Sequence, residues 1–175
     1  MLEEHDLIAG CKREEMWARK ELYEQYASAM LSLCARYVVD RDLARDVLQD
    51  GFYKVLTKIG DYYPDKGSFE AWMKRIFINT ALDQLQKKRF LPIISEYEES
   101  IEDPGASAFE KFSADDLHRC IAGLPAGSRT VFNLYAVEGY SHAEIAKMLQ
   151  IKEVTSRSQF MRARQMLQKK VQEIN

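Results

Sequence analysis

The amino-acid sequence predicts an all-α protein in which two small helical domains are joined by an acidic linker and the C-terminal domain is a helix-turn-helix. Apolar residues recur every three to four positions over long stretches, which is the period of a helix. No stretch alternates between apolar and polar residues in the way a strand does. Charges are sorted along the chain, with two basic blocks on either side of an acidic one. A chain of 175 residues with 46% apolar side chains is long enough to form two cores.

The first domain, residues 1–91, is expected to hold three helices. Their apolar positions recur at helical spacing over residues 22–37, 43–59 and 69–89. Asp40 and Ser68 precede the second and third stretches, and their side chains can accept hydrogen bonds from the free amides of a helix start. Pro64 and Gly67 mark the loop between these two helices.

Residues 92–112 are predicted to be a linker, because they contain a proline–glycine pair and have no sustained helical period. The region is strongly acidic: residues 95–116 hold eight Asp or Glu side chains and one lysine. By contrast, residues 74–90 contain five basic side chains against one acid, and residues 152–170 contain six against one. The net charge of the whole chain, −2, therefore does not reveal the two basic modules and the acidic connector between them.

The second domain, residues 113–175, is expected to contain four helices with short connections, over residues 117–124, 128–137, 141–149 and 155–171. Ser113 with Asp116 and Ser141 with Glu144 have the spacing of a capping box, in which a hydroxyl and a carboxylate bond the exposed amides of a helix start. A short capped helix, a brief turn and a long basic helix follow one another at the end of the chain. This order predicts a helix-turn-helix.

The last helix divides into two faces when its residues are placed 100° apart. One face is expected to pack against the domain and consists of Ser156, Phe160, Ala163, Leu167 and Val171. The opposite face consists of Thr155, Ser158, Arg162, Gln165 and Lys169. Such side chains suit a major groove, because arginine can bond both acceptors of guanine and lysine can hold phosphate. A basic helix face is more often simply solvated, but its position after a short capped helix favours DNA.

The third helix of the first domain carries a second candidate DNA surface. Arg75, Asn79 and Gln86 lie within a narrow arc beside Trp72, and the helix is predicted to end in the basic run Lys87, Lys88 and Arg89. Rings, amides and cations together suit opened DNA, in which bases stack or enter pockets and cations hold phosphates. In the alternative interpretation the rings of Trp72, Phe69 and Phe77 are core, and for Phe77 we prefer it.

The second helix displays acidic side chains beside apolar ones. Asp46, Gln49 and Asp50 accompany Phe52 and Val55. An acidic and apolar surface cannot favour DNA, so a protein partner is the natural interpretation. Generic solvent exposure would explain the acids equally well.

The sequence gives little support for membrane, metal-binding or enzymatic functions. No stretch approaches the roughly 18 apolar residues of a membrane span, and the acidic start lacks a signal segment, so a cytoplasmic location without membrane insertion is expected. Cys11, Cys34 and Cys120, like the three histidines, lack the spacing of a disulfide framework or a metal site. No phosphate-cradling glycine loop or activated nucleophile is evident. We therefore expect no enzymatic activity, no cofactor and no metal.

Three motifs follow one another along the chain. The first comprises Leu22-Tyr-Glu-Gln-Tyr26 and Asp46-Val-Leu-Gln-Asp-Gly-Phe-Tyr-Lys-Val55. The second comprises Gly67-Ser-Phe-Glu-Ala-Trp-Met-Lys-Arg-Ile76 with Asn79, Asp83 and Lys87-Lys-Arg89. The third comprises Leu124-Pro125, Arg129, Glu138-Gly-Tyr-Ser141, Glu144-Ile-Ala146, Thr155-Ser-Arg-Ser158 and Arg162-Ala-Arg164. In this order they resemble the polymerase-binding, minus-ten and minus-thirty-five segments of the extracytoplasmic-function branch of bacterial sigma factors.

The resemblance implies a specificity subunit that binds core RNA polymerase and directs it to promoter DNA. The polymerase-binding residues, expected on the clamp helices of the beta-prime subunit, would be Asp46, Gln49, Asp50 and Phe52. The loop 62–68 would form a pocket for a flipped minus-ten base, and the minus-ten contacts would be Tyr63, Ser68, Phe69, Trp72, Arg75, Asn79, Lys87, Lys88 and Arg89. The minus-thirty-five contacts would be Thr155, Arg157, Ser158, Met161 and Arg162. The linker would run through polymerase, the second domain would meet the beta flap, and an anti-sigma factor would be a further partner.

Two positions depart from the pattern of this family. The family usually has glycine where Gln150 and Val154 stand, on either side of the helix-turn-helix turn. Because a β-branched residue is strained at positive φ, we expect negative φ at Val154 or an altered turn. The alternative function is a stand-alone helix-turn-helix regulator, which would bind palindromic duplex DNA without polymerase.

Overall fold

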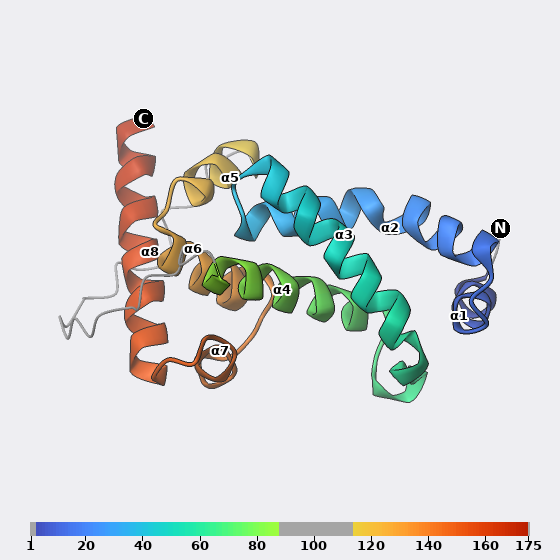
Figure 1. Cartoon of the computed structure of the whole chain (residues 1–175). Helices are drawn as coiled ribbons and strands as arrows, with labels where there is room; N and C mark the ends of the chain where they lie inside the picture. The colour runs from blue at the N-terminus through green and yellow to red at the C-terminus, as the bar shows by residue number, and fades with distance from the viewer. Residues whose placement is uncertain (1–2, 88–113, 175) are drawn as a thin grey trace. The chain divides into compact units, whose positions relative to one another are not determined.

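The computed structural model describes residues 3–87 and 114–174, and the chain divides into two compact units, Met1–Leu85 and Gln86–Asn175. Each unit is described by itself (Figure 1). All regular structure of the described residues is helical, as the sequence predicts. The predicted linker 92–112 and the predicted cap Ser113 lie outside the described residues.

The N-terminal unit contains four α-helices and two short 3-10 turns. Its elements are α1 (Glu4–Lys12), α2 (Met16–Tyr37), α3 (Arg41–Lys58), η1 (Ile59–Asp61), η2 (Pro64–Lys66) and α4 (Phe69–Lys87). The sequence prediction missed α1 and began the next helix at Leu22, six residues too late. Helix α1 is short, and it is stabilised by burying Leu7, Ile8 and Cys11 against its neighbours α2 and η1.

Both predicted caps of this unit are confirmed. The Asp40 carboxylate accepts a hydrogen bond from the backbone amide of Leu43 at 2.8 Å. The Ser68 hydroxyl accepts one from the amide of Ala71 at 3.2 Å. These bonds satisfy amides that a helix start leaves free, and they fix where α3 and α4 begin.

Aromatic rings fill the interface between α3 and α4. Phe52 of α3 and Phe77 of α4 meet edge to face with ring centroids 5.1 Å apart, and the ring of Tyr23 from α2 lies 4.9 Å from that of Phe52. Gly51 makes this close approach possible, since a Cβ atom there would lie 2.3 Å from Cε1 of Phe77. The preferred interpretation of Phe77 as a core residue is confirmed.

The C-terminal unit is built around its last helix. Its elements are α5 (Ala114–Ala122), α6 (Ala126–Phe132), the π-helical turn η3 (Asn133–Val137), α7 (His142–Leu149) and α8 (Glu153–Ile174). Helices α5, α6 and α7 all pack on α8. A core cluster joins α5 to α8 through Cys120, Ile121, Leu124, Ala163 and Leu167. The predicted capping box is present, because Ser141 and Glu144 each accept the hydrogen bond expected of them.

The turn between α7 and α8 shows the backbone conformation of Gln150 and Val154, the two positions where the family usually has glycine. Gln150 ends α7 in the left-handed region with φ of 55°. Val154 lies inside the first turn of α8 and has negative φ, as expected. Positive φ is therefore required at the first of the two positions and not at the second.

Replacing Gln150 by glycine is expected to stabilise the C-terminal unit by roughly 0.5–1 kcal/mol, because glycine adopts left-handed φ without the steric cost that a Cβ atom brings. Denaturant unfolding of the full chain, followed by circular dichroism, measures the change. Gln150→Val is the matched comparison and should destabilise the same unit, since β-branched side chains tolerate positive φ least. Equal stability of the three proteins would contradict the prediction.

Candidate nucleic-acid and protein interfaces

Helix α8 has one buried side and one accessible side. Ser156, Ala163 and Leu167 have no exposed surface, and Gln159 is also buried. The buried face predicted from the sequence is confirmed at these first three positions, while Phe160 is half-buried. On a helical projection the candidate minus-thirty-five residues fall outside this buried arc. Their described side chains are accessible: Arg157 is exposed, and the half-buried ones are Thr155, Ser158, Met161 and Arg162.

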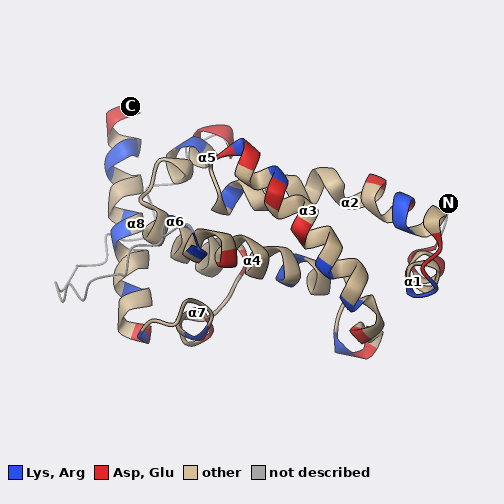
Figure 2. Ribbon diagram, viewed as in Figure 1, with Lys and Arg blue, Asp and Glu red and all other residues tan. Residues whose placement is uncertain are grey.

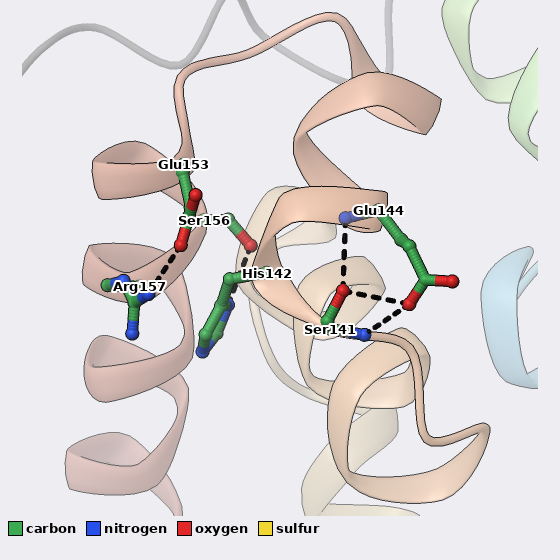
Figure 3. Close-up of polar contacts among 6 residues, drawn as sticks. All are labelled: Ser141, His142, Glu144, Glu153, Ser156 and Arg157. Atoms are coloured by element: carbon green, nitrogen blue, oxygen red, sulfur yellow. Dashed lines mark hydrogen bonds and ion pairs between the residues drawn. The ribbon is translucent and has the colours of Figure 1, made fainter.

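Polar contacts that the sequence did not reveal hold α8 in place. Nδ1 of His142, at the start of α7, lies 2.9 Å from the Ser156 hydroxyl in the first turn of α8 (Figure 3). The ring of His142 stacks on that of Tyr135 from η3, with centroids 4.3 Å apart. One turn further along α8, the buried Ser128 hydroxyl donates to the side-chain carbonyl of Gln159 at 2.7 Å. These bonds set the position of the exposed α8 face relative to α7 and α6.

The buried position of His142 is expected to make the stability of the C-terminal unit depend on pH. Burial lowers the pKa of His142 below its ordinary value of 6.5, and the nearby positive charge of Arg157 lowers it further. The folded unit therefore binds fewer protons at this imidazole than the unfolded chain does, so stability is full above about pH 6.5 and falls as the pH drops below it. Unfolding measured at about pH 7.5 and 5.5 should show this loss, and His142→Gln should reduce it.

The control for this pH effect is His118→Gln, which alters an exposed imidazole of the same unit. It should retain the full pH dependence of the wild type. If both variants lose as much stability as the wild type on acidification, His142 is not the source.

An ion pair occupies the exposed start of α8. Glu153 and Arg157 lie one turn apart, and their carboxylate and guanidinium are bonded (Figure 3). Ser158 donates its hydroxyl proton to the carbonyl of Val154 at 3.0 Å. Lys and Arg residues recur along most of α8 (Figure 2). This helix therefore presents cations and hydroxyls on a side that its own unit does not cover.

The candidate minus-ten residues are divided between the surface and the core. Arg75, Asn79 and Lys87 of α4 are exposed, and so are Tyr63 and Ser68 of the preceding loop. Trp72 is half-buried, and its ring stacks on that of Phe69 at 5.6 Å. Lys88 and Arg89 lie outside the described residues.

The expectation that Phe69 contacts DNA is wrong. Its side chain has no exposed surface, because the rings of Tyr26, Tyr62 and Trp72 surround it. The buried ring of Phe69 supports the ring of Trp72 by stacking against it. The alternative of a core role, which the sequence left open for this ring, is the correct one.

The predicted surface of α3 has its acidic residues accessible, but its exposed aromatic residue differs from the predicted one. Asp46 and Gln49 are exposed and Asp50 is half-buried. The expectation that Phe52 is part of this surface is wrong, since it is only 6% exposed and packs on Tyr23 and Phe77. Tyr53, one position later, is 69% exposed and shares a helix face with the acids. Figure 2 shows acidic and basic residues interspersed along the first part of α3 and basic residues alone towards its end.

Several other features of the described residues bear on function. None of the described helices has the length and apolarity needed to cross a bilayer. Residues 3–87 and 114–174 contain no cluster of three side chains suited to hold a metal ion. All three cysteines are free and buried, and burial raises the pKa of Cys34 to about 12, which leaves its thiol protonated and unreactive.

One unit is a helix-turn-helix with a basic outer face, and the other displays aromatic, amide and cationic side chains. This combination is typical of a DNA-binding transcription protein. Residues 22–90 match the family Sigma-70 region 2, and residues 114–167 match Sigma-70, region 4. Together the two matches span well over half of the chain. The chain belongs to the extracytoplasmic-function sigma factors of RNA polymerase.

Individual relatives agree with this membership. The RNA polymerase sigma-H factor of Pseudomonas aeruginosa is 29% identical over 97% of this chain and 94% of its own length. The ECF RNA polymerase sigma factor SigE of Mycolicibacterium smegmatis is 31% identical over 84% of this chain and 59% of its own length. Among solved structures, the sigma factor RpoE of Bartonella quintana, in complex with the anti-sigma factor NepR, shares the fold with a TM-score of 0.54. That match has 21% identity and covers 89% of this chain and 97% of the other.

Proposed function

We propose that this sigma factor binds core RNA polymerase through α3 and reads two promoter elements, the minus-ten element through α4 with its preceding loop and the minus-thirty-five element through α8. The observation that carries the proposal is the division of α8 into a buried side and an accessible side with Arg157, Ser158 and Arg162. A helix held this way by a capped partner helix can lie in a major groove. No group in the proposal acts as a catalyst.

The α3 surface is proposed to dock on the clamp helices of the polymerase beta-prime subunit. It consists of Asp46, Gln49, Asp50 and Tyr53, which recur at helical spacing on one face. An acidic face with an exposed ring repels nucleic acid and suits a basic protein surface with an apolar centre. The C-terminal unit is proposed to contact the beta flap, as the family membership suggests.

The minus-ten surface is proposed to hold opened DNA. Tyr63 and Ser68 are exposed in the loop before α4, and Arg75 and Asn79 follow on the accessible side of that helix. A ring and a hydroxyl can receive an unstacked base, while the amide reads an edge and the guanidinium holds phosphate. Lys88 and Arg89 are proposed to extend this grip along the backbone.

The minus-thirty-five surface is proposed to comprise Thr155, Arg157, Ser158, Met161 and Arg162. Arginine bonds guanine with two parallel hydrogen bonds, and a methionine can contact a thymine methyl group. Thr155 sits in the first turn, where helix amides favour a phosphate.

An anti-sigma factor is a proposed further partner. The support is the fold shared with a sigma factor crystallised with its anti-sigma factor. A protein that covers α3, α4 or α8 would compete with polymerase or promoter for the same side chains.

Reconstitution with core polymerase tests the proposal. The purified chain should bind core with high affinity and yield transcripts with defined start sites from genomic DNA fragments. Asp46→Asn with Asp50→Asn should weaken core binding by roughly thirty-fold, since each acid contributes about 1 kcal/mol to a complementary interface. The matched control, Glu3→Gln with Asp6→Asn, makes the same change of net charge on exposed residues of the N-terminal unit and should bind core like the wild type.

Two outcomes would overturn the proposal. Failure to bind core or to start transcription at defined sites would remove the function itself. Stable binding to palindromic duplex DNA without polymerase would point to a stand-alone regulator instead. Equal core affinity of both double variants would remove only the α3 assignment.

A further inference from the structure

The loop that precedes α4 is hydrogen-bonded to α1, through a residue fifty positions earlier in the chain. Nζ of Lys12, at the end of α1, donates a hydrogen bond to the backbone carbonyl of Tyr62 at 3.1 Å. Helix α1 also lies against η1, the turn that opens this loop. The contact therefore links α1 to the segment that displays Tyr63 and Ser68.

Tyr62 is the buried anchor of the same loop. Its hydroxyl donates to the carbonyl of Gly67 at 3.1 Å, which ties the two ends of the loop together. Its ring is only 5% exposed and lies 5.2 Å from that of Phe69 and 5.6 Å from that of Trp72. Gly67 has φ of 132°, a conformation open to glycine, so the chain can turn sharply there into α4.

Helix α1 packs closely on α2, and this packing fixes the position of the backbone that carries Lys12. Gly10 packs directly on α2, and a Cβ atom there would lie 2.7 Å from Cβ of Ala18. The corner after α1 is closed by Glu15, whose carboxylate accepts hydrogen bonds from Arg13 and from the Trp17 indole, each at 2.7 Å. A rigid α1 can therefore transmit its position to the loop.

We propose that Lys12 and Tyr62 are positioning residues for minus-ten recognition, which hold the loop of Tyr63 and Ser68 in its base-receiving shape before DNA arrives. The inference rests on the proposed minus-ten role of this loop. A loop already in its bound shape avoids the entropy cost of ordering on binding, so its base discrimination depends on the bonds that keep it ordered. Neither residue needs to touch DNA.

The test measures base discrimination by the holoenzyme. Forked promoter fragments, taken from the promoters found by start-site mapping, carry either the natural base or an abasic nucleotide at each unpaired minus-ten position. The ratio of the two affinities measures how much the base at that position contributes to binding. Tyr62→Phe removes the hydroxyl and keeps the ring, and Lys12→Met removes the amine and keeps most of the side chain.

We expect each variant to lower the largest discrimination ratio about five-fold, the effect of one lost hydrogen bond, with core affinity unchanged. Lys20→Met removes an exposed amine from α2 and should keep the wild-type ratio. Wild-type ratios in both variants, or an equal drop in Lys20→Met, would overturn the inference while leaving the minus-ten role intact. If the wild type does not distinguish natural from abasic fragments, the minus-ten role of the loop fails and the inference fails with it.

Thermal unfolding separates positioning from a general loss of structure. Lys12→Met changes an exposed side chain and should leave the N-terminal unit folded at the assay temperature. If both affinities fall in proportion to the unfolded fraction while their ratio stays at the wild-type value, the positioning role is contradicted.

Discussion

Replacing Gly51 by alanine is expected to lower the free energy of unfolding of the N-terminal unit by roughly 2 kcal/mol. The added methyl group would lie 2.3 Å from Cε1 and 2.4 Å from Cδ1 of Phe77, whose ring has no exposed surface and meets Phe52 edge to face. Overpacking of this kind costs about 1–3 kcal/mol, occasionally more, and exceeds the gain of up to about 1 kcal/mol that alanine brings to a helix. Denaturant unfolding of the full chain measures the change.

Gly60→Ala is the matched control for this substitution. A Cβ atom at Gly60 would have no neighbour within 4 Å, and the residue does not have positive φ. Its stability should therefore stay within about 0.5 kcal/mol of the wild type. A Gly51→Ala protein as stable as Gly60→Ala would show that α3 and α4 can separate without cost, and the close packing of Gly51 on Phe77 would lose its significance.

The double substitution Arg157→Ala and Arg162→Ala is expected to reduce transcription from promoters with a minus-thirty-five element by roughly a hundred-fold. Each arginine is proposed to bond a base edge or phosphate, and a good bidentate contact is worth about 1–3 kcal/mol of discrimination. Both side chains lie on the accessible side of α8, so their removal leaves the buried contacts of Ser156 and Gln159 unchanged. Single-round transcription by the reconstituted holoenzyme measures the effect.

The control pair for this experiment is Arg119→Ala with Lys147→Ala, two exposed cations of the same unit outside α8. It loses the same positive charge and should retain most of the wild-type transcription. A similar loss in both double variants would indicate general attraction to DNA rather than recognition by α8. Transcription unaffected by the arginine substitutions would contradict the proposed minus-thirty-five contacts.

Caps and helical periods were predicted accurately from the sequence because they depend on residues that are three or four positions apart. Asp40, Ser68 and the Ser141–Glu144 box lie where the sequence places them. The buried side of α8 followed from the same spacing. Val154 has negative φ, as expected for a β-branched side chain.

The two errors at the candidate interfaces, Phe52 and Phe69, share one physical cause. Phe52 and Tyr53 are adjacent in α3, and both are large aromatic residues that suit either the core or the surface. Phe52 is buried because Tyr23 of α2 and Phe77 of α4 pack against its ring, whereas Tyr53 remains exposed. Phe69 is likewise buried by rings from other elements.

The amino-acid sequence by itself determined the helical class, the capped starts of α3, α4 and α7 and the helix-turn-helix, and its ordered motifs identified a sigma factor. These properties rest on local hydrogen bonds and on the helical repeat, which a short stretch of chain specifies alone. Only the tertiary structure decided which aromatic rings are core, how His142 and Gln159 hold α8, and that Lys12 reaches the loop at Tyr62. Those contacts join residues far apart in the chain, so they exist only once packing has brought the helices together.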